Sequence, residues 1–421
     1  MSSAQYLLSI QSVRERSQLV FDRAKQNKLT NFTVDLEKIE QVTDYTLDVI
    51  NSKYSDYDDI PPHGRWQHFL VGNIDRIKAL LSTQEGPSNI ETARQLIDLF
   101  TVSVLLDAGA GNEWRYNESS GVVAGRSEGL AIASYNMFVS GSFSSDKAKP
   151  YQVDSKRLLE FTLADLEEGF QVTDKNPLAG VEGRTSLLQN LGEALKNSKY
   201  FGPEGRPGYL VDYLRSHKTA GKKEDGQYEV QLPVLWDALM EGLGPIWPKG
   251  RTKLDGTSLG DAWKCSSMPQ DQGEWAKIVT FHKLTQWLCY SILVPMTKFG
   301  DLIVLGQEHL TGLPEYRNGG LLVDLGLLKL RPEVEKLAEK TVNGIPRFPS
   351  DSDVIVEWRA VTVHCLDAIL DQVNKRIAPK KISLPQLLEG GTWTAGRQIA
   401  AEKRPLTSGP PIEIISDGTV F

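Results

Sequence analysis

Apolar side chains recur at every third or fourth position in several long segments of the chain. They do so at Leu36, Ile39, Leu47 and Ile50, again from 96 to 106, and again from 361 to 369. This spacing places them on one face of a helix. Alternating runs of strand type are few, at 227–232 and 412–420. The pattern therefore predicts a mainly α-helical fold with few short strands.

The sequence marks the starts of helices and the loops between them, but it marks no boundary between domains. A serine or threonine precedes an acid by three positions, as in a helix capping box, at Ser88, Thr162 and Ser350. Loops rich in proline and glycine are too short for interdomain linkers. We expect a single domain over 1–421, with its core at about 30–378 and a tail at 379–421 that wraps the surface.

Composition narrows the class of partner. The net charge of -7 argues against a nucleic-acid or anionic-membrane surface, since both require a basic footprint. Three widely separated cysteines suggest neither a disulfide framework nor a metal site. The first residues lack a signal-peptide pattern, and no apolar run is long enough to span a membrane. We expect a protein of the cytoplasm, with the nucleus as a second location, that binds a small molecule.

The run from Leu310 to Asp324 holds two charged side chains in a constrained turn. Glu315 and Arg317 lie between a proline and a pair of glycines, so the backbone is restricted on one side and free on the other. An apolar helical stretch is predicted to follow, from 321 to 330. A turn of this kind can hold charges in place beside a core.

A second polar motif lies in 281–290, a predicted helix that ends near Pro295. His282 and Gln286 are four positions apart, and Lys283 lies next to them among apolar residues. A buried ammonium needs a partner, and Glu315 is a candidate. Two interpretations remain open: a catalytic pair with Glu315 as general base or nucleophile, or a structural salt bridge.

Three further groups could contact a ligand or brace the site. Asp107 and Trp114 flank a glycine-rich turn, which suits a polar ring or sugar but equally a capped helix end. Arg126 and Glu128 precede a helix of small residues that Ser127 could cap instead. Two residues on the last long helix fit a structural role in anchoring a loop, namely Glu357 and Arg359.

Other catalytic signatures are missing from the sequence. The six histidines form no metal-binding motif, and there is no nucleophile elbow of the GxSxG type or phosphate-binding P-loop. The sequence therefore predicts neither a metal nor a cofactor.

Five motifs together resemble the fungal and bacterial uracil-catabolism protein family of the non-classical pyrimidine route. The resemblance covers nearly the whole chain. The motifs are Asp107-Ala-Gly-Ala-Gly, Gly125-Arg-Ser-Glu-Gly-Leu-Ala, Asn176-Pro-Leu with Glu182-Gly-Arg184, Phe281-His-Lys-Leu-Thr-Gln-Trp-Leu, and Leu313-Pro-Glu-Tyr-Arg-Asn-Gly-Gly-Leu-Leu.

A weaker resemblance is to queuosine-salvage nucleosidases, which have a helical fold related to DNA glycosylases. It rests on the order Phe-x-Lys-x-x-Gln from Phe281, then Leu310-Thr, then an acid followed by Tyr316-Arg. The Glu-Trp-Arg run at 357–359 is also similar to that family's Glu-Ile-Arg helix. In this chain the acid is Glu315 rather than aspartate, so the identity of the substrate does not transfer.

These resemblances imply a hydrolase that cleaves the N-glycosidic bond of ribosylurea or a related compound. Glu315 and Lys283 would be catalytic, with Asp107, Trp114, Arg126, Glu128, His282 and Gln286 binding substrate. Arg317, Asp324, Glu357 and Arg359 would brace the site. Two alternatives stay open: an amidohydrolase acting at the urea end, and a non-catalytic binding partner of other pathway enzymes.

Overall fold

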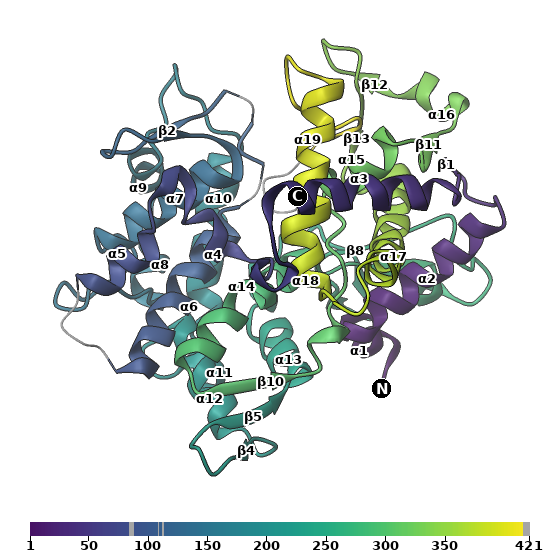
Figure 1. Ribbon diagram of the computed structural model, residues 1–421. Coiled ribbons are helices and arrows are strands. Elements are labelled where there is room, and N and C mark those ends of the chain that lie inside the picture. Colours follow the sequence, from purple (N-terminus) through teal and green to yellow (C-terminus); the bar gives the residue numbers. More distant parts are fainter. Residues whose placement is uncertain (84–87, 108, 112, 416–421) are drawn as a thin grey trace.

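The structure is a computed structural model that describes residues 1–83, 88–107, 109–111 and 113–415. It is mainly helical, as predicted, and its helices gather around two hydrophobic cores (Figure 1). The three periodic segments form α3 (Lys38–Lys53), α6 (Asn89–Leu105) and α17 (Asp353–Arg376). No helix in the described part of the chain is long and apolar enough to cross a membrane.

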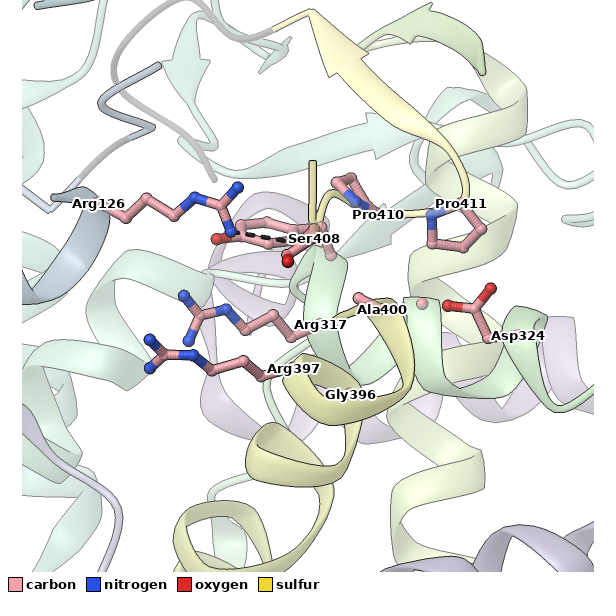
Figure 2. A pocket seen from close by; sticks show the side chains of 11 residues that line it. Arg126, Arg317, Asp324, Gly396, Arg397, Ala400, Ser408, Pro410 and Pro411 are labelled. Atoms are coloured by element: carbon pink, nitrogen blue, oxygen red, sulfur yellow. Dashed lines mark hydrogen bonds between the residues drawn. The ribbon is translucent and has the colours of Figure 1, made fainter. Parts of the chain in front are cut away.

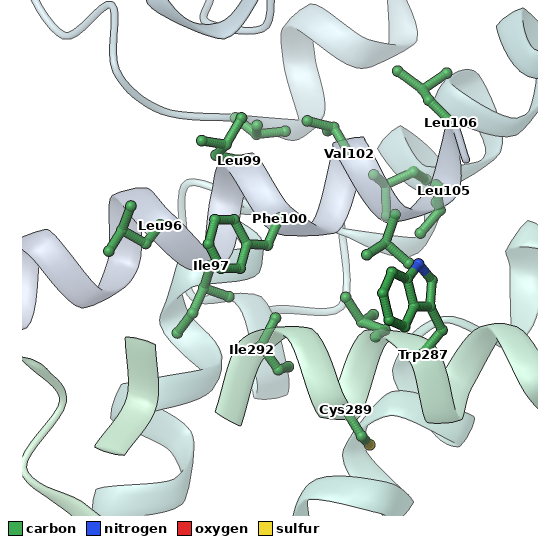
Figure 3. Close-up of a cluster of buried hydrophobic side chains, with 14 of the residues drawn as sticks. Leu96, Ile97, Leu99, Phe100, Val102, Leu105, Leu106, Trp287, Cys289 and Ile292 are labelled. Carbon is green, nitrogen blue, oxygen red and sulfur yellow. The ribbon is translucent and has the colours of Figure 1, made fainter. Parts of the chain in front are cut away.

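The first hydrophobic core is built where α6 packs along α14 (Lys283–Phe299). Figure 3 shows Ile97 and Phe100 of α6 facing Ile292 of α14. The other helices around this core are α4 (Arg65–His68), α5 (Arg76–Ser82), α7 (Arg126–Val139), α8 (Ser155–Leu159), α9 (Leu163–Gly169), α10 (Val181–Ala194), α11 (Ser198–Phe201), α12 (Leu210–Ser216) and α13 (Leu232–Gly242).

The second hydrophobic core surrounds α17, which packs against α2 (Ile10–Lys25) and α3. The remaining helices on this side are α1 (Ser3–Leu8), α15 (Tyr316–Asp324), α16 (Pro332–Leu337), α18 (Leu384–Gln386) and α19 (Trp393–Lys403). The short 3₁₀ turns of the chain are Tyr57–Asp59, Val71–Asn73, Pro207–Tyr209, Gly244–Ile246, Glu274–Lys277 and Gln307–His309.

The strands form small separate sheets. The sheet below the first core in Figure 1 has the order β10-β5-β4, with β10 parallel to β5 in the register Leu302↔Tyr228, which confirms the strand predicted at 227–232. Its strands are β4 (Gly221–Lys222), β5 (Tyr228–Gln231) and β10 (Leu302–Leu305). The others are β1 (Phe32–Val34), β2 (Tyr116–Asn117), β3 (Val123–Ala124), β6 (Lys253–Leu254), β7 (Thr257–Ser258), β8 (Ala262–Lys264), β9 (Ile278–Thr280), β11 (Leu328–Leu330), β12 (Glu339–Lys340), β13 (Pro346–Pro349) and β14 (Glu413–Ile415).

Several predicted boundaries were wrong. Helix α14 continues through Pro295 to Phe299, held by packing on α6. The stretch 321–330 is not one helix, because α15 ends at Asp324 and β11 then pairs with β1. Thr162 makes the predicted capping box, but α17 is capped by Ser352 rather than Ser350.

The C-terminal segment does not simply wrap the surface, as the sequence suggested. A π-helical segment, Leu387–Thr392, leads into α19, and both contribute side chains to the cores. Leu387 and Ala395 are fully buried. Gly396 lets α19 approach α15 closely, because a Cβ at this position would collide with the backbone of Arg317. Only 413–415 of the predicted strand 412–420 forms β14, and 416–420 lies outside the described residues.

Candidate functional site

Glu315 is the N-cap residue of α15, and its carboxylate is fixed there by the backbone. One carboxylate oxygen accepts the N–H of Arg317 at 2.7 Å and the other accepts the N–H of Asn318 at 2.6 Å. These donors are two of those that a helix leaves unpaired at its start, where a negative charge is also favourable. The turn predicted to hold charges therefore holds Glu315 as an oriented anion.

Lys283 is the first residue of α14, and its ammonium interacts electrostatically with Glu315 and Asp107. Burial lowers the pKa of Lys283, while those two carboxylates act in the opposite direction. The predicted pairing with Glu315 is thus a charge interaction and not a direct ion pair. Among the described residues, no hydrogen bond or ion pair engages the Lys283 ammonium, because the carboxylate of Glu315 is turned to its own helix.

Asp107 follows α6 and joins it to α4 and α7. Its carboxylate forms an ion pair with Arg65 at 2.9 Å and accepts a hydrogen bond from the Ser127 hydroxyl. Ser127 therefore does not cap α7, whose N-cap residue is Gly125. Asp107 is 8% exposed and Arg65 is fully buried, so this pair lies deep beside the ammonium of Lys283.

Glu128, in the first turn of α7, forms an ion pair with Arg397 of α19. Burial alone would raise the pKa of Glu128, but the charges of Arg317 and Arg397 outweigh that effect and lower it. The guanidinium of Arg317 lies 4.1 Å from the ring centre of Trp393, also on α19. Helix α19 therefore faces α7 and α15 with charged and aromatic side chains.

A pocket beside α15 and α19 is lined by three arginines. Figure 2 shows the guanidinium groups of Arg126, Arg317 and Arg397 together on one side of it, with Asp324 on the other. Arg126 donates to the carbonyl oxygens of Thr407 and Ser408 at 2.9 and 3.3 Å. Asp324 is bound by both terminal nitrogens of Arg404, so it braces the end of α15.

Three of the remaining candidates hold the framework. Arg359 binds Asp261 through two hydrogen bonds of 2.8 Å and lies over the ring of Phe281. Asp261 also accepts the backbone N–H of Lys283 at 3.0 Å, which fixes the start of α14. Gln286 donates to and accepts from Thr311, and Glu357 accepts the backbone N–H groups of residues 30–32.

Two residues that were predicted to bind the ligand, Trp114 and His282, have partners within the protein instead. Trp114 is fully buried, stacks on Phe170 and donates its indole N–H to that residue's carbonyl oxygen at 2.8 Å. It is a core residue, since its polar group already has a partner. His282 is the N-cap of α14 in a left-handed conformation with φ of 45°, and its ring bonds the carbonyl of Leu7 at 2.7 Å. His282 and Gln286 therefore do not form the predicted helical stripe.

The structure adds residues that the sequence interpretation left out. Trp287 follows Lys283 by one helical turn, and the rings of His63 and His68 pack on it. Trp393 faces the same two histidines, and Glu389 bonds His63. Glu389, Trp393 and Arg397 are spaced by four residues, which is the signal in the tail that could have identified them.

The site can therefore supply an oriented carboxylate, a buried ammonium and two further carboxylates, Asp107 and Glu128. Opposite charges held in a buried site interact more strongly than they do in water. Such an arrangement suits a reaction in which positive charge develops on a polar substrate. Within the described residues, no group of three or more His, Cys, Asp or Glu side chains is arranged to hold a metal ion.

Comparison with known proteins gives the family. Residues 6–421 match the family model described as "Protein of unknown function (DUF1688)". "Uracil catabolism protein 4" of Lachancea kluyveri is 48% identical over 435 aligned positions, and "Protein urg3" of Schizosaccharomyces pombe is 45% identical over 421. Both alignments cover 99% of this chain and 98% of the relative. The chain therefore belongs to the DUF1688 family, as a full-length relative of uracil catabolism protein 4 and Protein urg3.

Proposed function

We propose that the protein is an enzyme of uracil catabolism that hydrolyses the N-glycosidic bond of ribosylurea or a related nucleoside-like compound. The place in uracil catabolism is supported by the name of the Lachancea kluyveri relative, which aligns over nearly its whole length. The reaction is supported by the motif resemblance to queuosine-salvage nucleosidases that the sequence suggests.

The observation that carries the proposal is the carboxylate of Glu315, fixed at the start of α15 beside the charge of Lys283. Cleavage of an N-glycosidic bond passes through an oxocarbenium-like state with positive charge at the anomeric carbon. In this proposal Glu315 stabilises that charge and directs water to the carbon. Lys283 balances the negative charge of the carboxylates around it.

The sugar would be bound by the carboxylates across the site. Asp107 and Glu128 are acceptors that can pair with ribose hydroxyl groups. Both are already oriented by arginines, Asp107 by Arg65 and Glu128 by Arg397. Arg126 and Arg317, at the neighbouring pocket, would contact more polar parts of the substrate.

The test is incubation of the purified protein with ribosylurea and with its 5′-phosphate, followed by identification of the products. The proposal requires free ribose, or its phosphate, together with urea in equal amounts. Ammonia without ribose would instead identify an amidohydrolase. Binding without any product, in the presence of the other pathway enzymes as well, would identify a binding partner.

A further inference from the structure

An aromatic box lies next to the proposed reaction site. It consists of His63 and His68 between two indole rings, Trp287 of α14 and Trp393 of α19. The ring of His63 lies 4.6 Å from that of Trp287, and the ring of His68 lies 5.6 Å from that of Trp393. At these spacings the rings are in contact with one another, so together they form one aromatic wall against which a planar group can pack.

Two N–H donors of this box have no partner among the described residues. Arg65 donates to Nδ1 of His68 at 2.9 Å, so the proton of the neutral ring is on Nε2. Burial, with the charge of Arg65, holds the pKa of His68 well below its ordinary value, which fits the neutral form. His68 Nε2 and Trp287 Nε1 are buried and unbonded, although the side chains are only 5% and 6% exposed.

Unpaired buried donors are uncommon because each costs about 1–3 kcal/mol. The two unpaired donors lie on neighbouring rings, 5.8 Å apart between centres, so a ligand that reaches them must bring hydrogen-bond acceptors. Arg65 Nη2 and Arg317 Nη1 are also buried without a partner among the described residues. The part of the ligand that binds here is therefore expected to carry hydrogen-bond acceptors, such as a carbonyl oxygen.

The box adjoins the catalytic candidates directly. Trp287 follows Lys283 by four positions on α14, so both side chains leave the same face of the helix. On the other side, Trp393 lies under the guanidinium of Arg317, two residues after Glu315. A ligand whose sugar lies at Glu315 and Lys283 can therefore place its other end against this aromatic wall.

His63, at the edge of this box, is held in place by two hydrogen bonds. Its Nδ1 bonds the carboxylate of Glu389 at 2.6 Å, and its backbone N–H donates to Pro385 at 2.9 Å. Glu389 lies in the π-helical segment Leu387–Thr392, a rare geometry that is frequent at functional sites. The pair is 3% and 11% exposed. With Nδ1 engaged, Nε2 is the nitrogen left to meet a ligand.

We propose that the aromatic box binds the planar ureido group of the substrate and that His63 protonates the nitrogen that leaves the sugar. The carbonyl oxygen of the ureido group accepts from His68 and Trp287. This inference rests on the proposed function and identifies its leaving-group subsite and its general acid, which the sequence left open.

The step balances as follows. The bond from the anomeric carbon to nitrogen breaks, its electron pair passes to nitrogen, and that nitrogen takes the Nε2 proton of the His63 imidazolium. Water forms the new bond to the anomeric carbon and gives its proton to Glu315. Return of that proton to solvent and reprotonation of His63 restore the site. Ribosylurea and water thereby become ribose and urea, with Glu389 keeping the His63 ring in place.

Binding tests the subsite apart from turnover. Calorimetric titration uses ribosylurea and ribose on a Glu315→Gln background, so that substrate is not consumed. We expect ribosylurea to bind at least tenfold tighter than ribose, and Trp287→Phe, which keeps a ring but removes the N–H, to remove most of that difference. Trp275→Phe, outside the box, is the matched control and should leave it intact. Equal affinity for the two ligands, or an unchanged preference in Trp287→Phe, overturns the subsite.

Kinetics test the proton donor. We expect His63→Gln and Glu389→Gln to lower kcat for ribosylurea by about 10²-fold or more. His63→Gln should also remove a pH dependence of kcat that Glu389→Gln retains, because only His63→Gln lacks the imidazole. Exposed His309→Gln is the control. If that pH dependence persists in His63→Gln, His63 is not the acid. If the wild-type protein hydrolyses nothing, the proposed reaction fails, and the binding comparison alone decides the ureido subsite.

Discussion

Replacing Glu315 separates its role as a helix cap from its role in the reaction. The carboxylate accepts two backbone N–H groups, at 2.7 and 2.6 Å. Glutamine keeps one acceptor oxygen and loses one charge-assisted hydrogen bond, worth about 1.5–3 kcal/mol. The lost interaction with the helix dipole adds about 0.3–1 kcal/mol. Glu315→Gln should therefore lower the free energy of unfolding by about 2–4 kcal/mol.

The expected loss of activity is larger than this loss of stability explains. A domain with about 5–15 kcal/mol of stability remains folded after such a change. Removal of a charge that stabilises the transition state costs about 2.7–4 kcal/mol, or 10²–10³-fold in kcat. Glu315→Asp is the informative partner, because aspartate is a favourable N-cap residue but ends one methylene short. It should be nearly as stable as the wild type and still lose about tenfold or more in kcat.

The assay is urea denaturation followed by circular dichroism, together with steady-state hydrolysis of ribosylurea by the same preparations. Asp75→Asn provides a matched control, since Asp75 caps α5 through the N–H of Lys78 at 2.8 Å. That variant keeps the capping oxygen and loses only the charge at a helix start, so it should lose no more than about 0.3–1 kcal/mol of stability and none of the activity. The reasoning is refuted if Glu315→Gln retains kcat within threefold of the wild type, or if activity falls only in proportion to the unfolded fraction.

Three further predictions follow from the buried charges and thiols. Because burial lowers the pKa of Lys283, activity that needs its charge should fall as pH rises toward that lowered value, and Lys283→Arg should move this alkaline limit upward in the kcat/KM profile. Asp261→Asn should cost about 3–5 kcal/mol in urea denaturation at pH 7, because it leaves the buried guanidinium of Arg359 without its counter-charge. Burial acts to raise the pKa of Asp261, but the charge of Arg359 outweighs burial and holds that pKa low. The stability that the ion pair contributes is therefore complete above about pH 4 and is lost as the pH falls toward the pKa of Asp261 in the folded protein. The difference in unfolding free energy between the wild type and Asp261→Asn should shrink over that range. Burial raises the pKa of the Cys289 and Cys365 thiols, so iodoacetamide at pH 8 should leave both unmodified by mass spectrometry until urea is added, and rapid modification with loss of activity would favour a thiol nucleophile.

The sequence predicted those parts of the fold that one helix face decides. The apolar series in α3 is periodic because that helix buries one stripe, whereas α6 and α17 are buried on nearly all sides and keep the same helical spacing in their largest apolar residues. The turn around Glu315 could also be predicted, because the proline before it restricts the backbone and the two glycines after it release the backbone. What spacing could not decide was the direction of the carboxylate, which binds its own helix instead of Lys283.

Other features depend on contacts that no local pattern contains. Asp261 is one acid in a polar loop, and only the approach of Arg359, far along the chain, makes it a buried counter-charge. Trp114 is the kind of aromatic residue on which a ligand ring can stack, yet in the fold Phe170 stacks on it instead. The tail was predicted to wrap the surface because of its proline, glycine and charge content. The spacing of four residues between Glu389, Trp393 and Arg397 instead indicates one face of a helix.

The placement of these tail residues sets the order in which the site can come into being. His63 emerges early in synthesis, whereas Trp393 and Arg397 follow more than 300 residues later. At about 5–20 residues per second, the ribosome needs some tens of seconds to cover that interval. During that time Glu128 lacks its ion-pair partner Arg397, and the two histidines lack Trp393. The proposed site is thus assembled only after α19 has been made, and a chain released before that point has most of its two cores but lacks the residues that hold Glu128 and face the two histidines.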